Sequence, residues 1–476
     1  MDESVGKEGA GRPLWPFERS LLLWTLVALV VRLLWIALEP GNRIVADEGA
    51  WLAWGLDVLP APDVRFSPFR AQMIFHPPLY PYFIGIVAEV FGGLGAVKVA
   101  QALVGALLVP AVGLLGKRGF GRRAGLCAAA FVALYPELVW FTSHFWAETL
   151  FATVVWWAFE RYSTLLAPPS GTSSRGRVGL ALLTGLLLGF AILTRETVLY
   201  LLPFMALGLA WRRGWRDLLT AAAFFFAALA VVTPWTWRNH EVFGAFVPVS
   251  TSGGLNLYQG NARLTRQQVY DEWHAVRGRI AKYEFARKKG IEVILERQPW
   301  WIFEKLEQEM PDFWEADSQA LVHVRRGAYG EPRLAVAVAS TAVVVIPYLV
   351  LLVFFAVGIA VLPRGPVPVF VLGFLAYYTL LHVATHGYAR YRLPALPALF
   401  LVAGSALSSL GIVRWRHLTA QRRWATLLTA LLLCLSVLPS LRFLLRADTL
   451  VSENARFGLD PQGRPLDGER EGGSEP

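Results

Sequence analysis

The sequence predicts an all-α polytopic membrane protein with about 11 transmembrane helices, and three observations support this fold class. The 476 residues are 55% hydrophobic and only 17% charged, and the mean hydropathy is +0.45. A soluble chain carries about 25% charged residues. The apolar residues come in long runs, close to the roughly 20 residues that a helix needs to cross a bilayer core. Nineteen Trp residues also fit, because indole rings favour the membrane interface.

Eleven apolar runs are predicted to span the membrane. They cover residues 20–38, 97–116, 124–142, 147–166, 178–194, 196–211, 217–237, 336–362, 366–386, 393–413 and 424–444. The surplus of positive charge lies in short clusters between these runs, which is typical of cytoplasmic loops and not of a nucleic-acid interface. The clusters are Lys117-Arg118 with Arg122-Arg123, Arg212-Arg213 with Arg216, and Arg414-Arg416 with Arg422-Arg423. They place the N-terminus inside, and no nucleic-acid partner is expected.

The segment Leu79–Gly92 determines the rest of the topology. It is apolar, but its 14 residues reach only about 21 Å as a helix. It also contains Glu89 and ends in Gly92-Gly93. If it crossed the membrane, the cluster Lys117–Arg123 would lie outside. We therefore predict an interfacial or re-entrant helix on the outer side.

This topology divides the chain into five parts. Residues 1–19 form a cytoplasmic N-terminus, and residues 20–237 form an N-terminal transmembrane catalytic module whose first outer loop is 39–96. Residues 238–335 form an outer loop of surface helices, followed by C-terminal transmembrane helices over 336–444. Residues 445–476 form an outer tail, predicted to be disordered because it is rich in Gly, Glu and Pro.

Several ionisable residues fall together on the predicted outer side. Such groups are expensive at membrane depth and usually face a partner or a polar cavity. Arginine in short outer loops also runs against the positive-inside tendency. Carboxylates opposite arginines describe a site for an anionic, partly lipidic ligand. The residues are Asp47, Glu48, His76, Glu148, Arg195, Arg390 and Arg392.

Each candidate also has a structural interpretation. Asp47 could only cap the helix that follows it, and Glu148 could be a solvated charge or a cap. Arg195 could pair with a nearby carboxylate or extend to lipid head groups. His76 precedes two prolines, and the stretch Gly253–Asn261 could be a turn. Their joint placement on one side favours a functional site.

Six short motifs occur in a fixed order. They are Ala46-Asp47-Glu48-Gly49-Ala50-Trp51, Pro77-Pro78-Leu79-Tyr80-Pro81, Ala147-Glu148-Thr149-Leu150, Leu193-Thr194-Arg195-Glu196, Pro234-Trp235-Thr236-Trp237-Arg238-Asn239 with Gly253–Asn261, and Arg390-Tyr391-Arg392-Leu393-Pro394. In these motifs the chain resembles the GT-C class of membrane glycosyltransferases over roughly residues 20–410. The nearest likeness is to the bacterial branch related to protein O-mannosyltransferases and lipid A aminoarabinose transferases. The Trp-Trp-Asp-Tyr-Gly signature of oligosaccharyltransferases is missing from the sequence.

The resemblance implies an inverting transfer of a sugar from a polyprenyl-phosphate donor to an acceptor hydroxyl, on the outer face of the cytoplasmic membrane. It implies Asp47 as the general base and Arg195, with Arg390 or Arg392, as the binding site of the leaving phosphate. Glu148 would orient the donor sugar or, with Asp47, hold Mg²⁺ or Mn²⁺. The residues expected to contact donor or acceptor are Glu48, His76, Tyr80, Glu148 and Asn256. A lipid, a glycan or a protein all remain open as the acceptor.

Two other functions fit the sequence less well than a glycosyltransferase. A transporter or flippase of a lipid-linked or anionic substrate would carry charges near the midplane and two related halves. The ionisable residues here cluster at one predicted face instead, and the sequence shows no repeat. A membrane scaffold would leave the carboxylates and outer arginines unexplained.

Overall fold

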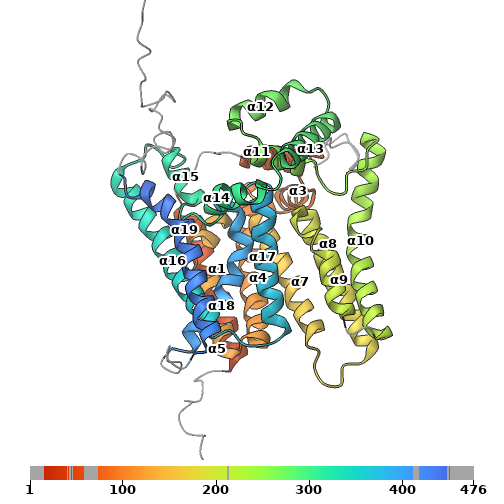
Figure 1. The fold of residues 1–476 in the computed structure, drawn as a ribbon, viewed down its shortest axis with the longest axis vertical. Helices are drawn as coiled ribbons and strands as arrows, with labels where there is room; N and C mark the ends of the chain where they lie inside the picture. The colour runs from red at the N-terminus through yellow and green to blue at the C-terminus, as the bar shows by residue number, and fades with distance from the viewer. Residues whose placement is uncertain are drawn as a thin grey trace, which may run out of the picture.

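The computed structural model describes residues 16–39, 41, 44, 47–57, 73–211, 214–410, 418–446 and 450. Over these residues the regular structure is entirely helical, which confirms the all-α class (Figure 1). The α-helices are α1 (Phe17–Leu38), α2 (Glu48–Asp57), α3 (Leu79–Phe91), α4 (Leu94–Gly119), α5 (Arg122–Leu134), α6 (Pro136–Trp140), α7 (Glu148–Leu166), α8 (Ser174–Thr194), α9 (Leu202–Ala210), α10 (Trp215–Phe243), α11 (Ser252–Asn261), α12 (Arg266–Ala275), α13 (Arg279–Glu296), α14 (Trp301–Trp314), α15 (Gln319–Arg325), α16 (Leu334–Ala360), α17 (Pro366–Ala384), α18 (Leu396–Ser408) and α19 (Ala420–Leu444). Three 3-10 helices join them: η1 (Phe141–Ser143), η2 (Glu196–Val198) and η3 (Ala389–Ala395).

Eight helices in the described part of the chain are long and apolar enough to cross a membrane. They are α1, α4, α8, α10, α16, α17, the continuous stretch Ala389–Ser408, and α19. The predicted span 124–142 is a pair of helices bent by 51°, and counting the pair as one span raises the total to nine. The other two of the eleven predicted spans are also helical. However, α7 carries Glu160 and Arg161, and Glu196–Ala210 is short.

Glycines let the spanning helices pack closely. A Cβ at Gly185 of α8 would lie 2.2 Å from the carbonyl oxygen of Phe224 in α10, and one at Gly116 of α4 would lie 2.6 Å from the Cα of Gly125 in α5. Small residues at such crossings allow helix backbones in a membrane to approach each other and gain van der Waals contact. The sequence therefore specifies these crossings through residues that have no bulky side chain.

Short helices gather at one end of this bundle. In Figure 1, α11 to α15 and α3 lie at the end opposite the start of α5. The predicted helix 79–92 is α3, which ends at Gly92 with a φ of 88°, a left-handed conformation that glycine adopts at no steric cost. It buries Tyr80 and Ile84.

The loop of residues 238–335 is helical over its described length, as predicted. Residues Thr265–Glu309 contain α12, α13 and most of α14. Helix α12 begins with a capping box, in which the Thr265 side chain accepts from the Gln268 amide and the Gln268 side chain accepts from the Thr265 amide. Gly253–Asn261 belongs to α11 and is not a turn, so the alternative interpretation of this stretch was wrong. The clusters at residues 212–213 and 414–416, and the tail from 451, lie outside the described residues.

Candidate active site

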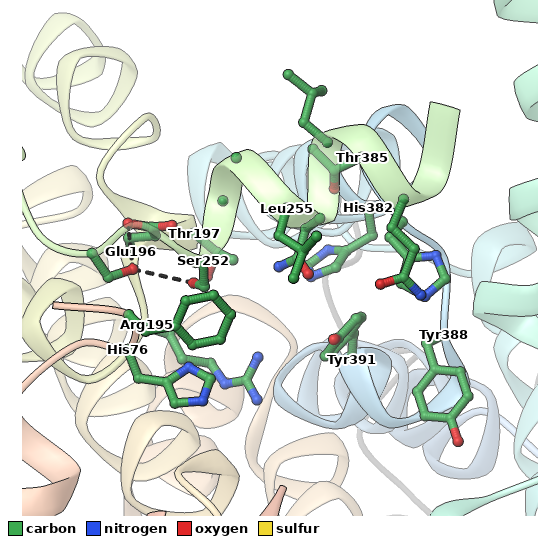
Figure 2. A pocket seen from close by; sticks show the side chains of 18 of the residues that line it. His76, Arg195, Glu196, Thr197, Ser252, Leu255, His382, Thr385, Tyr388 and Tyr391 are labelled. Atoms are coloured by element: carbon green, nitrogen blue, oxygen red, sulfur yellow. Dashed lines mark hydrogen bonds between the residues drawn. The ribbon is translucent and has the colours of Figure 1, made fainter. Parts of the chain in front are cut away.

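A cavity of about 700 Å³ lies where the short helices meet the ends of the spanning helices. Its walls come from the start of α2, the segment before α3, η2, α11, α12, α13, the end of α17 and η3. A cavity of this size falls in the range that holds small ligands. Figure 2 shows Arg195, His76 and Tyr391 facing the same space below α11.

Positive charge dominates the cavity wall. Five arginines line it, against two carboxylates. The arginines are Arg195, Arg266, Arg287, Arg326 and Arg390, and the carboxylates are Asp47 and Glu196. The guanidinium group presents a planar fork of donors that matches carboxylate and phosphate geometry. The cavity therefore suits an anionic ligand.

Two of the predicted carboxylates and two of the predicted arginines form one chain of ion pairs. Asp47 Oδ2 accepts from Arg390 Nη2 at 2.8 Å. Arg390 Nε lies 3.4 Å from Glu148 Oε1, and this same oxygen accepts from Arg195 Nη2 at 2.5 Å. Glu148 is 1% exposed, and the side chains of Arg390 and Arg195 are 9% and 15% exposed. Because buried charges are stable only when compensated, each member of this chain holds its neighbours in place.

The fold brings these four residues together from distant elements. Asp47 immediately precedes α2, and Glu148 is the first residue of α7. Arg195 lies in the break between α8 and η2, and Arg390 lies in η3. The backbone of Arg195 is extended at this break, and its side chain pairs with Glu148 at the start of α7.

The side chain of Asp47 is ionised and accessible. It is 43% exposed, and within the described residues its carboxylate bonds to Arg390 and to no backbone amide of α2. Partial burial opposes its ionisation, but the Arg390 guanidinium outweighs burial and holds the pKa of this carboxyl below its usual value. Asp47 is therefore not a simple N-cap. It is a carboxylate presented to the cavity.

His76 lies on an aromatic face of the cavity. Its ring stacks on that of Trp51, with centroids 4.2 Å apart. Burial lowers the pKa of His76 to about 3, against the opposing charge of Asp47. At neutral pH the ring is uncharged, so it can take part in hydrogen bonds and stacking but adds no positive charge. Asn256 also lines the cavity, from α11.

Four of the predicted residues lie outside the wall formed by the described residues: Glu48, Tyr80, Glu148 and Arg392. Glu148 sits behind the wall and contacts Arg195 and Arg390. Tyr80 donates to Gln101 Oε1 at 2.6 Å in the core. Arg392 donates to the carbonyl oxygens of Glu315 and Asp317, and its guanidinium lies 4.2 Å from the centre of the Tyr348 ring. These contacts tie η3 to the segment before α15.

Sequence reasoning missed three arginines of the wall and assigned no role to Glu196. Arg266 and Arg287 lie on α12 and α13, whose charges resemble those of any solvated surface helix. No local signal distinguishes them, because only the folding of α12 and α13 over the cavity brings them to it. Glu196 adjoins Arg195 in the sequence but accepts from Ser250 Oγ at 2.9 Å instead of joining the ion-pair chain.

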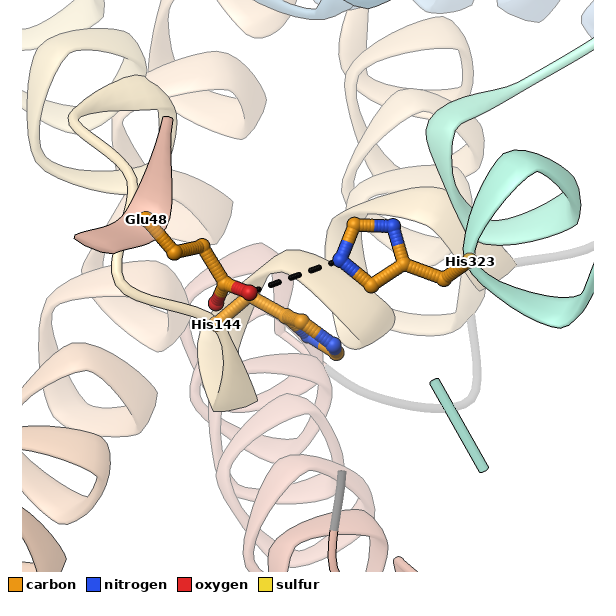
Figure 3. Close-up of side chains that lie close together, drawn as sticks. All are labelled: Glu48, His144 and His323. Carbon is orange, nitrogen blue, oxygen red and sulfur yellow. Dashed lines mark hydrogen bonds and ion pairs between the residues drawn. The ribbon is translucent and has the colours of Figure 1, made fainter. Parts of the chain in front are cut away.

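A second cluster, made of Glu48, His144 and His323, lies apart from the cavity wall. All three residues are buried, with exposures of 1%, 0% and 0%. One ligand atom from each lies within 4.8 Å of the others, so the cluster could hold a metal ion (Figure 3). The Mg²⁺ or Mn²⁺ considered for Asp47 and Glu148 stays a prediction, and in the structure both of those carboxylates face guanidinium groups.

One family model matches the chain. Residues 75–237 match the family described as dolichyl-phosphate-mannose-protein mannosyltransferase. The matched third of the chain runs from His76 and Tyr80 through Glu148 to Arg195. It confirms the resemblance to membrane glycosyltransferases related to protein mannosyltransferases. A search of curated proteins found no significant match.

Solved structures of two membrane proteins are similar to the chain at low identity. The archaeal oligosaccharyltransferase AglB from Archaeoglobus fulgidus, in complex with an inhibitory peptide and a dolichol-phosphate, matches with 15% identity and a TM-score of 0.49, over 92% of this chain and 56% of the other. ArnT from Cupriavidus metallidurans, bound to undecaprenyl phosphate, matches with 17% identity and a TM-score of 0.46, over 92% and 75%. The chain thus spans little more than half the length of AglB.

Proposed function

We propose that this protein transfers a sugar from a polyprenyl-phosphate donor to an acceptor hydroxyl, with inversion at the anomeric carbon. The acceptor oxygen attacks that carbon from the face opposite the phosphate. The new carbon–oxygen bond forms as the bond to the phosphate oxygen breaks, and the released lipid phosphate keeps the electron pair. The acceptor proton passes to a carboxylate. The family match and the arginine-rich cavity support this reaction class.

Asp47 is the general base in this proposal. Its carboxylate is ionised, accessible and at the cavity wall, which are the properties that a base for a hydroxyl proton needs. Its hydrogen bond to Arg390 fixes its orientation. The chain Asp47–Arg390–Glu148–Arg195 is the observation that carries the proposal, because it joins an accessible carboxylate and two cavity arginines in one connected unit.

Arg195 and Arg390 bind the leaving phosphate. Both line the cavity, and both are held by the Glu148 carboxylate. Fixed cations aimed at the phosphate stabilise the negative charge that grows on it as the bond to the sugar breaks. Glu148 keeps the two guanidinium groups together while the cavity is empty of phosphate.

The remaining predicted residues take different parts. His76 and Asn256 line the cavity and contact the donor sugar or the acceptor. Tyr80, Glu48 and Arg392 act from behind the wall by holding α3, α2 and η3 in position. Mg²⁺ or Mn²⁺ at Asp47 and Glu148 would require both carboxylates to leave their arginine partners.

The predicted topology places this reaction on the outer face of the cytoplasmic membrane. The basic residues Lys117 and Arg118 end α4, and Arg122 begins α5. Figure 1 shows the start of α5 at the end of the bundle opposite the short helices that surround the cavity. With the basic end in the cytoplasm, the cavity opens outside, where a lipid, a glycan or a protein can serve as acceptor.

The proposal is tested by transfer from synthetic polyprenyl-phosphate sugars to envelope acceptors, with the purified full chain in nanodiscs. Release of polyprenyl phosphate and labelling of the acceptor are measured together. Asp47→Asn should slow both by about 10²- to 10⁴-fold, the usual contribution of a general base. Asp271→Asn is the matched control and should behave as wild type, because Asp271 is exposed and lies outside the cavity wall.

Two outcomes would contradict the proposal. Undiminished transfer by Asp47→Asn would exclude Asp47 as the base. Movement of intact donor across the bilayer, with no release of polyprenyl phosphate, would instead identify a flippase.

A further inference from the structure

Glu48, His144 and His323 converge from three parts of the chain (Figure 3). Glu48 begins α2, His144 follows η1, and His323 lies in α15. The three side chains are 1%, 0% and 0% exposed. Three ionisable groups buried together must share protons or a cation, since isolated buried charges are unstable.

The two histidines are oriented alike. His144 Nδ1 lies 3.0 Å from the carbonyl oxygen of Trp140, and His323 Nδ1 lies 3.0 Å from that of Gln319. A carbonyl oxygen only accepts, so a hydrogen bond to it requires the hydrogen on Nδ1 and leaves Nε2 as the lone-pair atom of a neutral imidazole. Metal-bound histidines characteristically donate their second ring N–H to a carbonyl or carboxylate in this way.

The separations approach those of a tetrahedral metal shell. Metal–ligand bonds of about 2.0–2.2 Å put tetrahedral ligand atoms about 3.3–3.5 Å apart. His323 Nε2 lies 3.4 Å from Glu48 Oε2. All three ligand atoms lie within 4.8 Å of one another, so closing the shell shortens these separations by up to about 1.5 Å.

Glu39 is a candidate for the fourth ligand. Glu39 Oε1 lies 3.5 Å from His144 Nε2, in a side chain that is 2% exposed. This oxygen is buried, and among the described residues no donor makes a hydrogen bond to it. Tyr329 Oη lies 3.1 Å from the same nitrogen and accepts from Trp140 Nε1. Both groups lie on the side of His144 that a metal ion would occupy.

We propose that Glu48, His144 and His323 bind one Zn²⁺ ion, with Glu39 or water as the fourth ligand. Two histidines and one glutamate are an established three-ligand set for zinc, and imidazole nitrogen disfavours Mg²⁺ and Ca²⁺. The ion would join the start of α2 to α15 and to the loop before α7. Since Glu48 directly follows Asp47, the site would fix the position of the cavity carboxylate from behind. None of the three residues lines the cavity, so the ion would act by holding these elements together.

This site is tested by measuring the metal content of the protein, which does not depend on sugar transfer. The outcome therefore holds even if the proposed function is wrong. The full chain is purified without a polyhistidine tag, dialysed against chelator and titrated with Zn²⁺. We expect about one equivalent bound per chain by elemental analysis. Co²⁺ in its place should give the strong visible absorption of a tetrahedral site, and Zn²⁺ should displace it.

His323→Gln supplies the matched test. Removal of a direct ligand should weaken Zn²⁺ binding by more than the about 10- to 100-fold that loss of an outer hydrogen-bond partner costs. His274→Gln should keep the wild-type stoichiometry, because the His274 side chain is exposed and lies outside the cluster. Failure of the wild-type protein to bind either Zn²⁺ or Co²⁺ would overturn the proposal. The cluster would then be held together by a proton shared between His323 and Glu48. Undiminished binding by His323→Gln would overturn it as well. If that variant does not fold, the wild-type Co²⁺ spectrum decides.

Discussion

Arg390 donates a hydrogen bond to Asp47 at 2.8 Å, although 343 positions separate the two residues in the chain. The guanidinium of Arg390 also lies 4.3 Å from the centre of the Trp146 ring and 3.4 Å from Glu148. It therefore contacts both carboxylates of the ion-pair chain. The orientation of the proposed base depends on a residue from η3, at the far end of the sequence.

Arg390→Lys should lose most of the transfer activity even though it keeps the charge. A lysine ammonium is a point charge and cannot reproduce the planar fork that faces Asp47 and Glu148 together. We expect a fall in kcat/KM of about 10- to 150-fold, corresponding to the loss of one or more charged hydrogen bonds. Steady-state kinetics in nanodiscs measures this. Activity equal to wild type would mean that only the charge of Arg390 matters.

Arg195→Gln should weaken binding of the lipid phosphate. Arg195 lines the cavity and is paired with Glu148, so its removal takes away one fixed cation from the proposed phosphate site. Loss of a charged hydrogen bond predicts about 10- to 150-fold weaker inhibition by the product polyprenyl phosphate. Arg175→Gln, exposed near the other end of α8, is the control. Equal inhibition constants for the two variants would place the phosphate elsewhere.

Glu148→Gln should destabilise the protein, and polyprenyl phosphate should rescue it. The substitution leaves Arg195 and Arg390 without their shared counter-charge, and breaking a buried pair costs about 3–5 kcal/mol. The cost is reduced because the side chains of Arg195 and Arg390 are 15% and 9% exposed, so solvent screens part of their charge. A bound phosphate restores negative charge between the arginines, so the rise in Tm on adding lipid phosphate should be larger for the variant than for wild type. A smaller rise would argue against a phosphate at these arginines.

Gly185→Val should reduce stability without touching the cavity. The new Cβ would meet the Phe224 carbonyl oxygen at 2.2 Å, so α8 and α10 would have to separate. Overpacking of this kind costs about 1–3 kcal/mol, and thermal unfolding in detergent should show a lower Tm. Gly179→Val, also in α8, is the control, since nothing lies within 4 Å of a Cβ there. Equal Tm values for both would mean that the two helices pack less tightly than described.

Hydropathy was sufficient to predict the helical class and, over the described residues, the helical character of the predicted spans. A buried or lipid-facing helix must be apolar along its length, and this requirement is local, so it can be read from 20 residues at a time. The charges of α7 and the short length of Glu196–Ala210 explain why the predicted spans outnumber the helices that are long and apolar enough. Most residues of α7 are buried in the bundle, which is how it tolerates these charges.

Part of the candidate site was also predictable. Asp47, Glu148, Arg195 and Arg390 stand out because ionisable residues beside apolar runs need a partner. Which carboxylate pairs with which arginine was not predictable. Nothing in the sequence shows that Glu148 lies between two arginines, or that Arg392, two positions from Arg390, faces carbonyl oxygens in the core instead.

The sequence by itself determined that this protein is a helical membrane protein with charged residues gathered beside its spans, because burial in lipid constrains each segment separately. Only the tertiary structure decided which charges share a cavity, since that depends on how helices far apart in the chain cross. It brought Arg266 and Arg287 over the cavity. It also turned Glu48 away from the cavity wall and toward His144 and His323.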